Sequence, residues 1–212
     1  MNLSALLGEI PFCEQKYLPY FQEPLSVVSN IGFLVAFFFL LKERPKGVEK
    51  LLVFLILMVG LGSASYHTYR SPLTHFLDVI PIYLILMTSL FLLLKKLVLN
   101  TKTAALLLSL FIVLQASLAV ILPRNFLRSF LNGSLRYVIA LFVLLGIYVY
   151  AQSRSLKNQR FLLYALVSFT VAIFFRSIDI LVCPVFPFGT HFLWHIFVSV
   201  TAYYTTLFLL RS

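Results

Sequence analysis

Long apolar stretches alternate with short polar connections along the chain, and the connections leave no room for a separate soluble domain. A helix needs about 20 mostly apolar residues to cross roughly 30 Å of hydrocarbon, and seven stretches meet this requirement. We therefore predict an all-α integral membrane protein, a seven-transmembrane helix bundle. It forms one domain over residues 1–212, with an N-terminal interfacial segment at 1–23. The predicted spans are 24–42, 50–70, 72–94, 103–122, 134–152, 159–181 and 189–210.

Composition supports this class and indicates an orientation. Of 212 residues, 61% are hydrophobic and 11% are charged, far from the average of a soluble domain. The net charge of +10 suggests nucleic acid at first sight, but its distribution favours another explanation. One side of the bundle carries Lys42, Arg44, Lys46, Lys50, Lys95, Lys96, Lys102, Arg154, Lys157, Arg160 and Arg211. The other side carries Lys16, Arg70, Arg124, Arg128 and Arg136, while Arg176 lies within a span.

Eleven cations against five follow the positive-inside rule. The rule predicts a cytoplasmic C-terminus and an N-terminus outside the cell or in a lumen. The charge is then an orientation signal, and we predict no nucleic-acid partner.

The two cysteines fall on the same side of this topology. Cys13 lies in the N-terminal segment and Cys183 in the connection between the last two spans, both on the non-cytoplasmic face. That compartment permits disulfides, so we predict a Cys13–Cys183 bridge. The alternative is that both are small buried apolar side chains.

Polar and ionisable side chains interrupt three spans near this face. Ser63 and His67 end the second span one helical turn apart, and Asp78 begins the third. His191 and His195 repeat the four-residue spacing at the start of the seventh span. Ionisable groups inside apolar spans are costly and are functional candidates by default. The topology places all five residues at a similar depth on one side of the membrane.

Three imidazoles can hold a catalytic zinc ion that keeps one position open for water. The ligands would be His67, His191 and His195. Asp78 would act as base and acid on the water and the leaving group, and Ser63 would donate to the developing oxyanion. The alternative is that the histidines are hydrogen-bonded packing residues.

Other residues near these spans also have two interpretations. Ser29 and Asn30 suit either helix packing or support of a site. Arg176 and Asp179, three residues apart, favour an ion pair on one helix face. His75 reads as an interfacial histidine, and the aromatic residues of the N-terminal segment, Phe12 among them, suit the membrane interface.

The order of the motifs from about residue 13 to about residue 200 is informative. The motifs are Cys13 with Glu14, Glu23 with Pro24, Ser29 with Asn30, Gly62 to His67, Asp78 with Pro81, Asp179 with Cys183, and His191 to His195. In order and spacing, the set resembles the alkaline ceramidase family. That family belongs to a wider group of seven-span hydrolases that also includes adiponectin-type receptors. The ending Trp194-His195 favours the ceramidase branch.

The resemblance implies a zinc-dependent amidase that cleaves the N-acyl bond of ceramide-like sphingolipids into a fatty acid and a sphingoid base. It implies His67, His191 and His195 as zinc ligands with Ser63 and Asp78 beside the metal. It also implies the same disulfide. Further support would come from residues that match the family's motifs, namely Glu14, Glu23, Asn30, Asp179 and Trp194.

One departure from the family concerns calcium. Eukaryotic members hold calcium in the N-terminal segment, where this chain keeps Glu14 and Glu23. Pro11 stands where an aspartate is expected and Lys16 where an asparagine is expected. Because calcium requires hard oxygen ligands, we predict that no calcium binds.

Two other functions remain open from the sequence. One is a hydrolase or transferase for another lipid amide or ester, and the other is a lipid-responsive receptor with a structural metal. In each case the partner is a membrane lipid and the site lies near the non-cytoplasmic face. The resemblance implies a multi-pass protein of a bacterial inner membrane or of a eukaryotic membrane of the endoplasmic reticulum or Golgi type.

Overall fold

The computed structural model describes residues 12–14, 23–97, 100–123, 126 and 130–211. These residues form helices and connections, with no strand among them. The elements are α3 (Pro24–Ser29), α4 (Ile31–Leu41), α5 (Gly47–Tyr69), α6 (Pro72–Leu97), α7 (Thr101–Ile121), the 3₁₀ helix η1 (Phe130–Gly133), α9 (Leu135–Ser153), α10 (Arg160–Val182) and α11 (His191–Arg211).

Seven helical stretches of the described residues are long and apolar enough to cross a membrane. The first is α3 and α4 together, and the others are α5, α6, α7, α9, α10 and α11. This confirms the all-helical class and the number of spans. The sequence placed the start of α5 three residues late and the end of α6 three residues early, because charged residues at the membrane boundary still belong to the helices.

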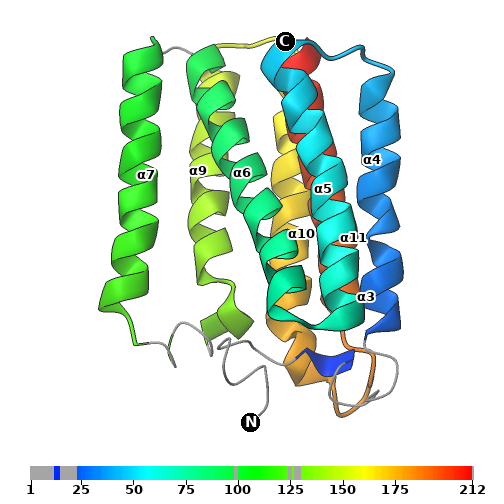
Figure 1. Cartoon of the computed structure of the whole chain (residues 1–212). Coiled ribbons are helices and arrows are strands. Elements are labelled where there is room, and N and C mark those ends of the chain that lie inside the picture. Colours follow the sequence, from blue (N-terminus) through cyan, green and yellow to red (C-terminus); the bar gives the residue numbers. More distant parts are fainter. Residues whose placement is uncertain (1–11, 15–22, 98–99, 124–125, 127–129, 212) are drawn as a thin grey trace.

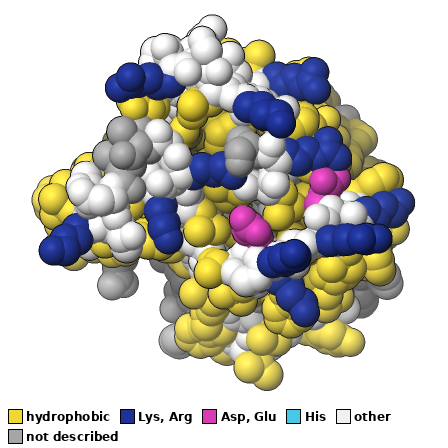
Figure 2. Space-filling view, turned by 90° about the horizontal axis from the view of Figure 1, so that it is seen from above, with side chains coloured by type: hydrophobic (Ala, Val, Ile, Leu, Met, Phe, Trp, Pro, Cys, Tyr) yellow, Lys and Arg dark blue, Asp and Glu magenta, His cyan; other side chains and the backbone are white. Residues whose placement is uncertain are grey.

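The long helices stand side by side, with α7 at one edge of the bundle and α4 at the other (Figure 1). The α5–α6 and α10–α11 connections lie at the end opposite the C-terminus, which we call the site end. At the other end, Lys and Arg side chains surround the helix termini (Figure 2). This distribution agrees with the tally of cations. The assignment of that end to the cytoplasm stays a prediction.

Helices α5 and α6 are in close backbone contact at Gly62. A Cβ atom at this position would collide with the backbone carbonyl of Leu77. Pro81 lies inside α6 and has no N–H to offer the carbonyl four residues earlier, which is that of Leu77. The freed carbonyl therefore faces a glycine rather than a side chain. This close contact sets Asp78, the next residue, beside Ser63.

Candidate metal centre

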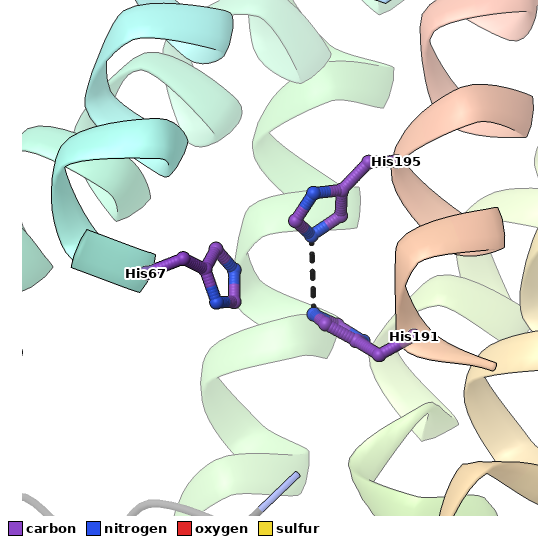
Figure 3. A group of neighbouring side chains, drawn as sticks. All are labelled: His67, His191 and His195. Carbon is purple, nitrogen blue, oxygen red and sulfur yellow. Dashed lines mark hydrogen bonds between the residues drawn. The ribbon is translucent and has the colours of Figure 1, made fainter. Parts of the chain in front are cut away.

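Three histidines from two helices meet at the site end of the bundle. His67 comes from the last turn of α5, and His191 and His195 come from the first two turns of α11 (Figure 3). One ligand nitrogen from each lies within 4.8 Å of the others. All three side chains are buried, with 2 to 3% exposure. The structure thus brings together the three histidines that the sequence singled out.

The imidazoles are oriented for a shared ion. The Nε2 atoms of His191 and His195 lie 3.1 Å apart, and Nδ1 of His67 faces away from them toward the Glu23 carboxylate. Two ligand atoms on one tetrahedral zinc ion are separated by about 3.3 Å. Ligating histidines usually give their second nitrogen to a carboxylate or a carbonyl, as His67 does here. The donor set therefore fits a transition-metal ion.

A break in the first span supports His195. Asn30 separates α3 from α4, and its backbone N–H bonds the carbonyl of Val27 rather than that of Ser26. The Ser26 carbonyl is then open to Nδ1 of His195 at 3.0 Å. The Ser29 hydroxyl and the Asn30 amide lie 3.2 and 3.0 Å from the same Nδ1 atom. Of the two interpretations of Ser29 and Asn30, the contacts favour support of the site.

Glu23 joins His67 to a residue that sequence reasoning missed. Its carboxylate is fully buried and contacts both Nδ1 of His67 and the guanidinium of Arg70. Arg70 ends α5 in a left-handed conformation, which turns its side chain back over the helix. There its Nη1 donates to the Tyr66 hydroxyl at 2.7 Å. The sequence counted Arg70 only as a surface cation, and its position directly after the helix was the one available signal.

Ser63 and Asp78 lie on another side of the histidines. Ser63 is buried, and its hydroxyl is a hydrogen-bonding partner of the Asp78 carboxylate. Asp78 is half-buried and within electrostatic range of His67 and of His75. Oδ1 of Asp78 has no hydrogen-bond partner among the described residues. A carboxylate with a free oxygen beside a metal centre can accept a proton from water.

Phe12 and Cys13, the described part of the N-terminal segment next to the histidines, lie over His191 at the site end. The Phe12 ring stacks on His191 with centroids 3.7 Å apart and planes 15° from parallel. Phe12 is 8% exposed, so its prediction as an interfacial residue was wrong. The next residue, Cys13, forms the disulfide to Cys183 with Cα atoms 5.5 Å apart. The bridge predicted from topology is therefore present, and it ties the cover to the α10–α11 connection.

Asp179 has a different role from the predicted pair with Arg176. Its Oδ1 accepts from the backbone N–H of Thr190 at 2.7 Å and of His191 at 2.9 Å, and its Oδ2 accepts from Cys13 N–H at 3.0 Å. No Arg176–Asp179 ion pair occurs among the described residues, so that expectation was wrong. The free N–H groups at the start of α11 compete for the carboxylate.

Glu14 is committed to the first span. Its carboxylate accepts from the backbone N–H of Leu25 at 2.6 Å and of Ser26 at 3.1 Å, and from the Ser26 hydroxyl at 2.8 Å. Pro11 and Lys16, on which the calcium expectation depended, lie outside the described residues. The expectation that calcium is absent therefore stays a prediction.

An apolar cavity of about 160 Å³ extends from the metal centre into the bundle. Ser63, His195 and Trp194 line the end next to the histidines, which we call the head of the cavity, and Leu93, Ile147 and Thr205 line its deep part. Ten residues of α11 separate His195 from Thr205, which corresponds to about 15 Å. The cavity is thus a mostly apolar space that begins at His195 and reaches Thr205.

Fold and site together define a polytopic membrane protein with a buried three-histidine cluster suited to a metal ion. The family model described as Ceramidase matches residues 7–211, nearly the whole chain. The chain therefore belongs to the ceramidase family, as its motifs suggested. Membership indicates a hydrolase that acts on amide bonds, with a lipid such as ceramide as substrate. No curated protein matches the chain.

Proposed function

We propose that this chain is a zinc-dependent intramembrane amidase that hydrolyses the N-acyl bond of ceramide-like sphingolipids. The products are a fatty acid and a sphingoid base. One observation carries the proposal: three buried imidazoles converge beside the Ser63–Asp78 pair, at the head of an apolar cavity. By the positive-inside rule, this site lies near the non-cytoplasmic face.

The proposed zinc ligands are His67, His191 and His195. When bound, zinc supplies Lewis acidity toward the amide carbonyl and lowers the pKa of water at the site. Glu23 and the Ser26 carbonyl hold two of the imidazoles by their Nδ1 atoms. This fixes which nitrogen of each ring faces the centre and makes the ligands more basic.

Asp78 moves the proton in this proposal. A water molecule adds to the carbonyl carbon, and its proton passes to the free oxygen of Asp78. The carbon–nitrogen bond then breaks, and Asp78 returns the proton to the leaving nitrogen. Ser63 orients the carboxylate first. Once Asp78 has taken the proton, the Ser63 hydroxyl is free to donate to the negative charge on the carbonyl oxygen. The net reaction adds one water across the amide bond and gives a carboxylic acid and an amine.

The cavity would hold the acyl chain. Its walls on α6, α9 and α11 are almost wholly apolar. An extended chain advances about 1.25 Å per carbon for bonds of about 1.5 Å and angles near 111°. A depth of about 15 Å, from ten residues of helix, then corresponds to roughly 12 carbons. The amide group would lie at the level of Ser63 and His195.

The test combines metal content with lipid turnover. Purified wild-type protein should contain zinc by elemental analysis and release fatty acid from N-acyl sphingosine in detergent micelles. His67→Ala, His191→Ala and His195→Ala should each lose most of the metal and the turnover. His75→Ala is the matched control, because this fourth histidine packs on Tyr66 outside the cluster, and it should keep the metal.

Three outcomes would count against the proposal. Full turnover by all three alanine variants would refute the metal-hydrolase mechanism. Zinc binding without turnover of any lipid amide or ester would favour a receptor with a structural metal. Turnover of another lipid amide or ester, but not of ceramide, would keep the mechanism and replace the substrate.

A further inference from the structure

Arg176 is a cation within a span that no described carboxylate neutralises. It lies in α10, near the site end, and is partly buried. Its Nε atom has no hydrogen-bond partner among the described residues. A charge in an apolar span is expensive, and such residues usually face a functional cavity or a partner. Arg176 therefore needs an explanation beyond packing.

The carboxylates near Arg176 are committed elsewhere. Asp179, one turn along the same helix, accepts three backbone N–H groups. Glu23 contacts His67 and Arg70, and Glu14 caps the first span. Asp78 lies within electrostatic range of Arg176, but the two form no ion pair among the described residues. Among the described residues the guanidinium thus has no ion-pair partner, which leaves it open to an anion from outside the protein.

Three aromatic rings fix the place of this guanidinium. Its Cζ atom lies 5.2 Å from the Trp194 ring, 5.3 Å from Tyr137 and 5.5 Å from Phe12. Trp194 and Tyr137 line the head of the apolar cavity, and Phe12 stacks on the proposed ligand His191. The positive charge therefore lies at the site end, beside the rings that line the head of the cavity and beside the ring that covers His191.

The position of the Arg176 guanidinium indicates which part of a substrate it would contact. If the acyl chain fills the cavity and the amide lies at the histidines, the groups on the amine side remain at the site end, where Arg176 lies. A planar guanidinium binds a carboxylate through two parallel N–H···O bonds, and charge-assisted bonds are about twice as strong as neutral ones. The hydroxyl of a neutral ceramide would offer only a neutral acceptor.

We propose that Arg176 binds an anionic oxyacid group on the amine side of the substrate, so that acidic N-acyl lipids are preferred over neutral ceramides. This inference rests on the proposed amidase function. It assigns to Arg176 a specificity role, separate from the metal ligands and from Asp78.

The first test compares three lipids that share one acyl chain and one backbone. They carry a hydroxymethyl group, a carboxylate or the methyl ester of that carboxylate on the carbon that bears the amide nitrogen. Wild-type protein should show a kcat/KM for the carboxylate about 10- to 100-fold above that for the ester, the range of one charge-assisted hydrogen bond. Arg176→Gln should lose this preference, and Arg176→Lys should keep part of it.

A matched control separates this effect from a general loss of positive charge. Arg136 lies at the same end of the bundle, where its guanidinium donates to the Tyr83 hydroxyl at 2.9 Å. Arg136→Gln should keep the preference for the carboxylate. An equal loss of turnover on all three lipids in Arg176→Gln would show a structural role and overturn the inference. Equal kcat/KM values for all three lipids in wild-type protein would overturn it as well.

The second test measures binding without turnover. Trp194 is the only tryptophan of the chain and lies against both Arg176 and the cavity, so its fluorescence reports on a ligand there. In chelator-treated protein, the carboxylate lipid should bind about 10- to 100-fold more tightly than its ester, and Arg176→Gln should remove the difference. Palmitate, the free acid, should bind more weakly than the carboxylate lipid.

The two tests fail in distinguishable ways. Equal binding of carboxylate and ester would overturn the role of Arg176, even if neutral ceramide is hydrolysed. Selective, Arg176-dependent binding without hydrolysis of any lipid would uphold the anion site and refute the amidase function. If palmitate bound as tightly as the carboxylate lipid, Arg176 would bind the carboxylate of the fatty-acid product rather than a group on the amine side. That result would overturn the inference.

Discussion

The Glu23→Gln substitution tests whether the buried carboxylate organises the metal centre. Glutamine keeps the shape of the side chain but removes the charge that faces His67 and Arg70. His67 and Arg70 contact different oxygens of Glu23, and in glutamine an NH₂ group, which is a donor, replaces one of these two acceptors. At one of the two contacts, the NH₂ group of the glutamine must then face another hydrogen-bond donor.

Two effects of different size follow from this geometry. Glu23 and Arg70 are 0% and 7% exposed, and removing one partner of a buried ion pair costs about 3–5 kcal/mol. Loss of the carboxylate behind a metal-bound histidine lowers metal affinity by about 10- to 100-fold. We expect a large fall in the melting temperature of the detergent-solubilised protein and a weaker zinc-binding isotherm. Turnover should recover in part at high zinc concentration.

Glu43→Gln is the matched control, because Glu43 also pairs with an arginine, Arg211, at the opposite end of the bundle. That pair is exposed to solvent, and such pairs contribute little to stability. The hydrogen bond from Arg211 holds the pKa of Glu43 below its usual value. Its contribution is therefore present above the unfolded-state pKa and is lost as the pH falls through the lower folded-state pKa. If Glu23→Gln matched Glu43→Gln in melting temperature and zinc affinity, the reasoning would be refuted.

Three further substitutions test other parts of the site. Ser63→Ala should lower kcat by about 10²- to 10³-fold, the range for loss of one oxyanion donor, and should leave KM nearly unchanged. A rise in KM of the same size would indicate a role in binding instead. Ala202→Phe places a ring in the cavity two turns beyond the last histidine, so the substrates with the highest kcat/KM should have shorter acyl chains. Ile196→Phe, on the exposed face of α11, should leave the chain-length preference unchanged. Cys183→Ser should lower stability by about 2–5 kcal/mol, measured by thermal unfolding; equal melting temperatures with and without reductant in wild-type protein would contradict this.

Much of the fold and the histidine cluster could be predicted from local sequence because the membrane restricts the options. A span must be apolar over about 20 residues, so the span boundaries were read to within about three residues. Once the spans alternate in direction, the depth of a residue follows from its distance to the span end. That reasoning placed His67 level with His191 and His195, and Cys13 on the same side as Cys183, as the structure shows.

The surroundings of the histidines could not be predicted, because they depend on how each helix is rotated and how it ends. The contact of Ser26 with His195 requires the break at Asn30, which the sequence does not mark with glycine or proline. The inward turn of Arg70 requires a left-handed residue at the end of α5. For Asp179, the three-residue spacing to Arg176 favoured the wrong partner, since spacing says nothing of backbone N–H groups from another segment.

The network at the site end also explains why metal binding and the fold of the first span should be coupled. A buried polar group without a partner costs about 1–3 kcal/mol, and here each carboxylate serves two elements. Glu14 accepts a hydrogen bond from α3. Glu23 joins the start of α3 to the end of α5. Asp179 joins the Cys13 backbone to the start of α11. Displacing residues 12–14 would leave several of these groups unsatisfied at once and would uncover His191. The segment that covers the metal centre is therefore also a structural part of it, and the two should be lost together on unfolding.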